Sequence, residues 1–345
     1  MLLFNNPALK KITPILTLII WIASCSSKKH EASFYYWKTN FKLSETENQV
    51  LNKTNTSGIY IRFFDVDKKN DSIVPFGVIS GLENIPDSLL VVPTLFITNR
   101  TLLGATKDNV STLSKNLSNK INKMAAIYNI KFNELQIDCD WSEKTRAAYF
   151  DLLQKLQIQF PAKTLSATIR LHQIKYPLRS GIPPVKKGVL MFYNMGKLNN
   201  EQNKNSIYNS EDASKYVSYI KSYPIELDYA LPIFSWQVHK RNNKVIGLIS
   251  KDELPDTTNP EILLKLNPGS FKIKSPFLHK GRYFMQGDEL RTEQINKTTL
   301  VEAAKLLSEN IDKTKPHKII FFDLDETHFK FITHETIKEV LDILN

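Results

Sequence analysis

Strand-like and helix-like segments alternate along most of the chain, and this alternation narrows the possible folds more than any other feature. Seven segments are rich in β-branched and aromatic residues: 58–67, 89–98, 134–141, 165–171, 188–196, 227–234 and 318–326. Stretches between them, such as 108–129, 142–159 and 298–312, carry apolar residues at helical spacing. Strands separated by helices predict a parallel sheet that is covered on its faces.

The strand count and the loops favour a closed barrel over an open sheet. No glycine-rich phosphate or dinucleotide turn follows any of the predicted strands. We therefore expect an α/β fold, a single-domain (β/α)₈ barrel of the TIM type. A doubly wound open sheet and two smaller domains divided near residue 200 are the alternatives. Residues 236–250 resemble a hairpin around 241–243, whereas prolines interrupt any pattern in 251–297.

Composition excludes several classes of protein. The chain has 345 residues, of which 42% are hydrophobic and 23% are charged, which excludes wholesale disorder. It contains only two cysteines, Cys25 and Cys139, which excludes a disulfide scaffold. The one long apolar run is at the N-terminus, so the chain is not a multispanning membrane protein.

The N-terminus has the features of an export signal. Lys10 and Lys11 precede the apolar segment 12–22, which is too short to span a bilayer, and Ala23, Ser24 and Cys25 follow. Apolar and small residues directly before a cysteine resemble the lipobox of bacterial lipoproteins. The resemblance implies cleavage before Cys25 and lipidation of that residue. The expected divisions are a signal peptide at 1–24, a lipidated tether at 25–32 and a barrel domain at 33–345.

Charge and export together indicate the partners. The net charge is +11, or about +9 once Lys10 and Lys11 are removed, which favours anionic partners such as lipid headgroups or acidic polysaccharides. Export argues against nucleic acid. We expect a protein of the bacterial cell envelope, held by its lipid in a membrane, with the outer membrane preferred and with a periplasmic or surface-exposed body.

Polar residues gather at the predicted strand ends, where a barrel of this type carries its functional groups. In the segment 134–141, period-two geometry places Gln136, Asp138 and Asp140 on one face. Carboxylates that lie this close repel each other, and burial disfavours their charge, so one pKa should rise. Such a pair can supply an acid and a base from one residue type. The alternative is that these acids pair with Arg62 or Arg170 for structural reasons.

The segment Ile137-Asp138-Cys139-Asp140-Trp141 resembles the fourth-strand signature of chitinase-like glycoside hydrolase barrels. In that family an aromatic residue is followed by the acid-catalyst glutamate, whereas here Ser142 follows Trp141 and the glutamate is Glu143. The resemblance implies a glycosidase-like barrel with a rearranged site. It gives Asp140 or Glu143 as proton donor and Asp138 as its orienting partner.

Other strand-end residues complete the predicted site. Asp323 and Asp325, at the end of the last strand, are expected opposite Asp138. Aromatic rings near strand ends would stack on sugars. The residues expected to bind substrate are Arg62, Asp65, Gln136, Arg170, Tyr193, Asn194, Tyr229 and Trp236.

Two other chemistries are disfavoured. The segment 319–327 resembles the first motif of haloacid-dehalogenase phosphatases, but only 18 residues follow Thr327, too few for that family's remaining motifs. The histidines show no zinc-site spacing, so neither a metal nor a cofactor is expected. The sequence therefore predicts a lipid-anchored barrel that acts on carbohydrate, as a two-carboxylate glycoside hydrolase if it is active. The alternative is a non-catalytic polysaccharide-binding or envelope-assembly lipoprotein.

Overall fold

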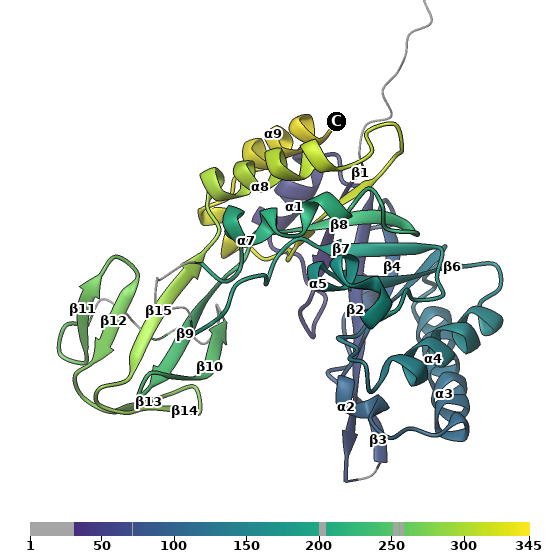
Figure 1. The fold of residues 1–345 in the computed structure, drawn as a ribbon, viewed down its shortest axis with the longest axis horizontal. Coiled ribbons are helices and arrows are strands. Elements are labelled where there is room, and N and C mark those ends of the chain that lie inside the picture. The colour runs from purple at the N-terminus through teal and green to yellow at the C-terminus, as the bar shows by residue number, and fades with distance from the viewer. Residues whose placement is uncertain (1–30, 71, 200–204, 251–254, 256–258) are drawn as a thin grey trace, which may run out of the picture.

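The computed structural model describes residues 31–345 except 71, 200–204, 251–254 and 256–258 (Figure 1). Within these residues, eight parallel strands form a closed barrel, because the first strand pairs with both the second and the last. The predicted (β/α)₈ fold is confirmed. In order around the barrel the strands are β1 (Glu31–Tyr36), β2 (Gly58–Lys69), β4 (Leu90–Ile97), β5 (Glu134–Asp138), β6 (Thr164–Arg170), β7 (Lys187–Met191), β8 (Glu226–Pro232) and β16 (Lys318–Phe322).

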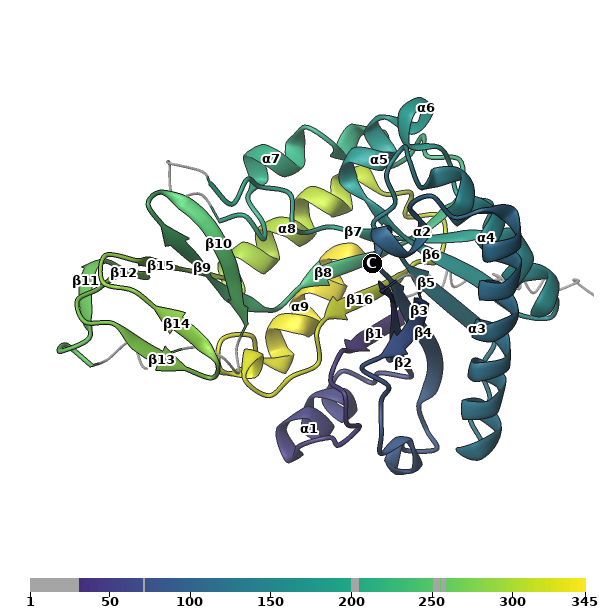
Figure 2. The same ribbon diagram turned by 90° about the horizontal axis from the view of Figure 1, so that it is seen from below.

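Helices surround the barrel (Figure 2). The longest, α3, buries the predicted apolar stripe that includes Val110, Leu117 and Ile121, and Thr106 caps its first turn. The helices are α1 (Glu45–Lys53), α2 (Asn99–Leu102), α3 (Lys107–Ile127), α4 (Arg146–Gln159), α5 (Leu171–Lys175), α6 (Pro177–Ser180), α7 (Ser210–Ser214), α8 (Lys297–Asn310) and α9 (His334–Leu344). Short 3₁₀ turns lie at Leu82–Asn84, Val217–Tyr219 and His328–Lys330.

The strand that our sequence pattern missed is β1. Its run Phe34-Tyr35-Tyr36 is buried on both faces, so it lacks the polar-apolar alternation of a half-exposed strand. β1 lies between β16 and β2. The last barrel strand is therefore separated by β1 from β2, the strand that carries Arg62 and Asp65.

Strand β5 has the predicted alternation with a shorter length. Gln136 and Asp138 face the barrel interior, where they contact Tyr35 and Thr168, while Tyr149 of α4 contacts the outer side of the strand at the Ile137 carbonyl. The strand ends at Asp138, not at residue 141. Helix α4 begins at Arg146 and not at residue 142, because a turn intervenes in which the Thr145 hydroxyl accepts from the Ser142 amide.

An inserted lobe follows β8 and returns to the barrel at α8 (Figure 1). The predicted hairpin at its start is confirmed, with Asn242 and Asn243 at φ of 49° and 60° in its turn. Residues 263–294, unassigned from sequence, form further strands around a small core. The lobe's strands are β9 (Ser235–Arg241), β10 (Lys244–Ser250), β11 (Leu263–Asn267), β12 (Ser270–Ile273), β13 (Phe277–His279), β14 (Arg282–Phe284) and β15 (Glu289–Gln294).

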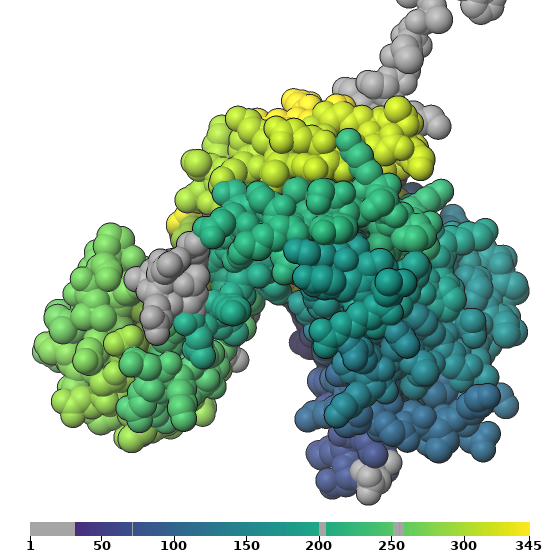
Figure 3. Space-filling view, in the orientation of Figure 1, coloured from purple at the N-terminus to yellow at the C-terminus, as the bar shows by residue number. Residues whose placement is uncertain are grey.

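The lobe and a long hairpin border opposite sides of a hollow. β2 continues beyond the barrel and pairs with antiparallel β3 (Ser72–Phe76). Figure 3 shows the molecule deeply hollowed between this part of the barrel and the lobe. The inserted strands thus help to enclose the carboxyl end of the barrel.

Candidate functional site

A cleft of about 740 Å³ opens at the carboxyl end of the barrel strands. The lobe contributes Ser235, Trp236 and Ser250 to one wall, and barrel strands and their loops supply the rest. Active sites of TIM barrels lie at this end of the fold, which makes the cleft the candidate site. Its lining residues are Trp37, Lys38, Thr39, Asn40, Arg62, Phe96, Asp138, Asp140, Arg170, Met191, Tyr193, Asn194, Phe234, Ser235, Trp236, Ser250, Phe322, Asp323 and His328.

Asp138 lies at the floor of the cleft and is only 6% exposed. The Thr168 hydroxyl donates to its Oδ1 over 2.7 Å. Burial, together with the nearby charge of Asp140, raises the pKa of Asp138 to about 7. The predicted rise in one carboxyl pKa on this strand therefore falls on Asp138.

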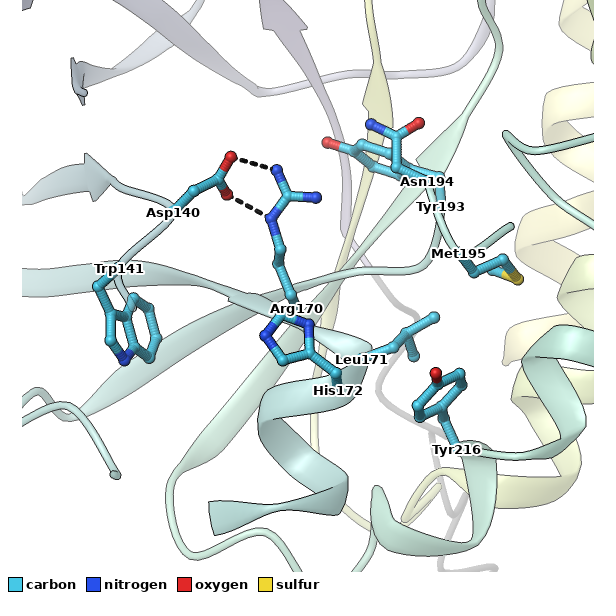
Figure 4. Close-up of a pocket in the computed structure, with 9 residues that line it drawn as sticks. All are labelled: Asp140, Trp141, Arg170, Leu171, His172, Tyr193, Asn194, Met195 and Tyr216. Atoms are coloured by element: carbon cyan, nitrogen blue, oxygen red, sulfur yellow. Dashed lines mark hydrogen bonds and ion pairs between the residues drawn. The ribbon is translucent and has the colours of Figure 1, made fainter. Parts of the chain in front are cut away.

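Asp140 is held by an arginine from the neighbouring strand. The guanidinium of Arg170 donates from Nε and Nη2 to the two carboxylate oxygens of Asp140 (Figure 4). The Asp140 side chain is 44% exposed and lines the cleft. A bidentate pair of this kind fixes the orientation of the carboxylate, and both of its oxygens are already engaged.

A second hollow of about 420 Å³ adjoins the ion pair and is lined also by His172, Asn194 and Tyr216. The Tyr193 hydroxyl is directed toward the Asp140–Arg170 pair (Figure 4). It is buried and has no hydrogen-bond partner among the described residues. A buried donor without a partner is uncommon in proteins, so Tyr193 has a hydrogen bond to offer to a bound molecule.

Arg62 lies on β2 at another part of the cleft wall. Its Nη1 is 3.4 Å from Asp65 Oδ2, and its guanidinium lies over the Trp37 ring at 5.5 Å from the centroid. Burial raises the pKa of Asp65 and the nearby Arg62 opposes that rise. Asp65 is buried behind the arginine and does not line the cleft.

The two predicted acids after β16, Asp323 and Asp325, lie in different surroundings. Asp323 lines the cleft, and His328 Nε2 lies 2.8 Å from its Oδ1. Asp325 is turned away and contacts Lys38 at 3.1 Å and the backbone amide of Thr327. These contacts hold the Asp325 carboxylate outside the cleft lining, so the structure brings only Asp323 of this pair to the candidate site.

Three other predicted residues also lie outside the cleft. Glu143 is exposed and pairs with Arg179, because the turn after β5 carries it away from the strand ends. Tyr229 packs edge-on against His317 and lines a separate hollow at the amino-terminal end of the barrel. Gln136 is fully buried below Asp138, where it accepts a hydrogen bond from Tyr35. The structure therefore does not bring these three residues to the cleft lining.

Three aromatic rings that the sequence did not assign to the site, Trp37, Phe234 and Phe322, join the predicted Tyr193 and Trp236 in its wall. Phe322 lies 5.4 Å from Trp37 and 5.6 Å from both Tyr193 and Phe234, measured between ring centroids. Phe234 in turn contacts Trp236 at 5.3 Å. The rings come from β1, β7, β8, β9 and β16 or the residues just after them, so no local pattern could have grouped them.

Polar residues were missed for a similar reason. Thr168 contacts Asp138, His328 contacts Asp323, and Lys38 also lines the cleft. Each is separated in sequence from its partner or has no distinctive spacing. The only available signal was their position near strand ends. Cys25, the predicted lipidation site, lies outside the described residues.

Two further properties concern metals and membranes. In the part of the chain that the structure describes, no group of three or more His, Cys, Asp or Glu side chains is arranged to hold a metal ion. None of the helices described is both long and apolar enough to cross a membrane.

Comparison with known proteins gives matches at the level of structure. No family model matches the chain, and no curated protein matches its sequence. Among solved structures, the spore cortex-lytic enzyme SleL of Bacillus cereus aligns with a TM-score of 0.56 and 12% identity. The alignment covers 92% of this chain and 75% of the other.

Two chitinases give similar alignments. Catalytic domain 2 of the Group II chitinase of Ostrinia furnacalis has a TM-score of 0.50 and 12% identity, over 91% of this chain and 96% of that one. The GH18 chitinase of Cycas revoluta in complex with (GlcNAc)₃ has a TM-score of 0.50 and 13% identity, over 91% and 98%. At these identities the comparisons establish the fold alone: the chain is a (β/α)₈ TIM barrel, the fold that it shares with SleL and these chitinases.

Proposed function

We propose that this protein binds a carbohydrate chain in the cleft at the carboxyl end of its barrel. The observation that carries the proposal is the continuous set of aromatic rings, Trp37, Phe322, Phe234 and Trp236, beside a floor of polar side chains. The apolar face of a sugar ring packs on an aromatic ring, and its hydroxyls need hydrogen-bond partners. A largely apolar cleft with a few placed polar groups meets both needs.

The structural relatives favour amino sugars as the first ligands to test. The Cycas revoluta chitinase was solved with (GlcNAc)₃ bound. The cleft of this chain lies at the carboxyl end of the same type of barrel, and the buried Tyr193 hydroxyl in its wall lacks a partner among the described residues. We therefore expect binding of N-acetylglucosamine oligomers.

Recognition without turnover is the function that the geometry favours. Asp140, predicted as proton donor, has both carboxylate oxygens on Arg170, and Glu143 lies outside the cleft. A proton donor must reach the leaving oxygen of its substrate. Neither residue is placed to do so.

Hydrolysis is the second candidate, and Asp138 favours it. A carboxyl group whose pKa is about 7 can both donate and accept a proton at neutral pH. Asp323 lines the same cleft and would be the second carboxylate of a two-carboxylate mechanism.

The proposal includes export and attachment to a bacterial membrane through lipid on Cys25. The first barrel strand begins at Glu31, at the amino-terminal end of the barrel. The six residues 25–30 before this strand can span at most about 20 Å, so this end of the barrel would lie close to the membrane. The cleft at the opposite end would then open away from the membrane, toward a polymer rather than toward lipid headgroups.

A combined binding and cleavage experiment tests the function. Chitotetraose and cellotetraose are titrated calorimetrically into the protein that begins at residue 26, and new reducing ends are measured in parallel. We expect chitotetraose to bind without cleavage and Asp140→Asn to leave cleavage absent. Cleavage that is lost in Asp138→Asn would instead establish the hydrolase. Failure of every oligosaccharide to bind would contradict the proposed function.

The anchor is tested separately. The full chain and its Cys25→Ser variant are expressed in a bacterium fed a clickable palmitate analogue. We expect label and membrane association for the full chain and loss of both in Cys25→Ser. Equal labelling of the two forms would contradict lipidation at Cys25.

A further inference from the structure

The three long cationic side chains that line the cleft differ in how well their charges are neutralised. Lys38 contacts two carboxylates, of Glu47 at 2.5 Å and of Asp325 at 3.1 Å. Arg170 makes its bidentate pair with Asp140. Arg62 has one carboxylate contact, a long one of 3.4 Å to Asp65.

Arg62 also has a hydrogen-bond donor without an acceptor among the described residues. Its Nε is buried and has no hydrogen-bond partner among the described residues. A buried unpaired donor is destabilising, and more so when the group is charged. Such a group is retained most readily where a ligand completes its hydrogen bonds.

The surroundings of Arg62 indicate what that ligand carries. Its guanidinium lies over Trp37, so a sugar that contacts this part of the aromatic wall lies beside a positive charge. Each of the three cleft acids has another partner: Asp138 contacts Thr168, Asp140 pairs with Arg170, and Asp323 contacts His328. Arginine's planar fork of donors suits a carboxylate better than a neutral hydroxyl.

We propose that the cleft selects an amino-sugar chain that bears carboxylate groups, and that Arg62 determines this specificity by binding the sugar carboxylate. The inference rests on the proposed function and adds the substrate class to it. The net charge of +11 acts in the same direction, because it attracts a polyanionic chain at long range.

The test compares two chains of equal length that differ in charge. A hyaluronan hexasaccharide, in which glucuronate alternates with N-acetylglucosamine, and chitohexaose are titrated into the full-length protein in neutral detergent. We expect hyaluronan to bind roughly tenfold more tightly, the effect of one charge-assisted hydrogen bond. Arg62→Gln should remove most of this preference, and Arg62→Lys, which keeps the charge without the fork, only part of it.

A matched control separates specific recognition from general attraction. Arg100→Gln removes a charge from an exposed arginine that pairs with Asp67 outside the cleft, and it should keep the preference. Polyglutamate should not compete with hyaluronan.

Two results would overturn the inference in distinguishable ways. If chitohexaose binds as tightly as hyaluronan, and Arg62→Gln leaves the ratio unchanged, the carboxylate specificity is wrong while the proposed carbohydrate binding stands. If neither hexasaccharide binds, both proposals fall. Equal losses in Arg62→Gln and Arg100→Gln would show that only general electrostatic attraction operates.

Discussion

Glu134 and Asp138 lie four residues apart on β5, facing the same barrel interior at its two ends. Glu134, at the amino-terminal end, receives two hydroxyl donors and an ammonium group, at 3.3, 2.7 and 3.3 Å from Tyr60, Ser166 and Lys318. Asp138, at the cleft end, receives one hydroxyl donor, from Thr168. Both carboxylates are buried, but the fold supplies three donors to Glu134 and only one to Asp138.

Neighbouring groups at the two ends follow the same division. The Tyr60 hydroxyl has a partner in Glu134, whereas the Tyr193 hydroxyl in the cleft has none among the described residues. The hollow at the amino-terminal end has a volume of about 150 Å³, against about 740 Å³ for the cleft. The cleft end therefore offers a ligand more space than the amino-terminal end does, beside a tyrosine hydroxyl that no described residue engages.

The largest effect that we expect concerns the pH dependence of stability set by Asp138. Its pKa is about 7 in the folded protein and about 4 in an unfolded chain. The folded state therefore binds the proton more tightly. The free energy of unfolding should fall as pH rises from about 4 to about 7, by as much as about 4 kcal/mol.

Asp138→Asn should remove this dependence and stabilise the protein at pH 8. Urea unfolding of both forms at pH 5 and pH 8 measures it. A free energy of unfolding that rises with pH over this range in the wild type, or an unchanged slope in the variant, would contradict the assignment.

The next largest effect concerns the satisfied carboxylate. Glu134→Gln should lower the free energy of unfolding by about 2–3 kcal/mol, because it leaves the Lys318 ammonium and its neighbours with a weaker partner. Glu226→Gln, at an exposed glutamate at the start of β8, is the matched control and should change stability by less than about 0.5 kcal/mol. Comparable losses in both variants would remove the distinction between the two ends.

Ligand binding should be confined to the cleft end. Trp236→Ala should weaken chitotetraose binding roughly tenfold, as truncation of a central aromatic residue does at many interfaces. Lys221→Ala, which changes an exposed residue of the amino-terminal hollow, should leave binding unchanged. Calorimetric titration of the two variants decides between the two hollows. A larger loss of affinity in Lys221→Ala would place the ligand in the amino-terminal hollow.

The smallest effect distinguishes the two tyrosines. Tyr60→Phe should lower the free energy of unfolding by about 1 kcal/mol, because it removes a hydrogen bond to Glu134. Tyr193→Phe should change it by less than about 0.5 kcal/mol, since the hydroxyl that it removes has no partner within the described residues. Urea midpoints at constant slope measure both changes. A greater loss of stability for Tyr193→Phe than for Tyr60→Phe would contradict this distinction between the two hydroxyls.

Local patterns predicted the barrel because its strands and helices have distinct periods. Seven of the eight barrel strands, the helix at 107–127 and the hairpin at 235–250 follow from residue spacing and turn residues. β1 escaped this reasoning because a strand that is buried on both faces has no alternation to detect. Strands β11 and β13 of the lobe escaped it because they are short and mostly exposed or only partly buried.

The candidate site was only partly predictable for a different reason. Strand-end position identified Asp138, Asp140, Arg170 and Asp323, all of which line the cleft. The same rule also selected Glu143 and Asp325, which do not line the cleft, because a turn after a strand can redirect a side chain within two or three residues. Lipidation at Cys25 remains a prediction, since it lies outside the described residues.

The sequence by itself determined the alternating strands and helices and the inward-facing pair Gln136 and Asp138, because both depend on periodicities that are local to a segment. Only the tertiary structure decided which carboxyl group has a pKa near neutrality and which carboxylate pairs with Arg170. It also decided which arginine has a donor without a partner among the described residues. Desolvation and ion pairing depend on neighbours from other strands. Those neighbours are brought together only when the barrel closes.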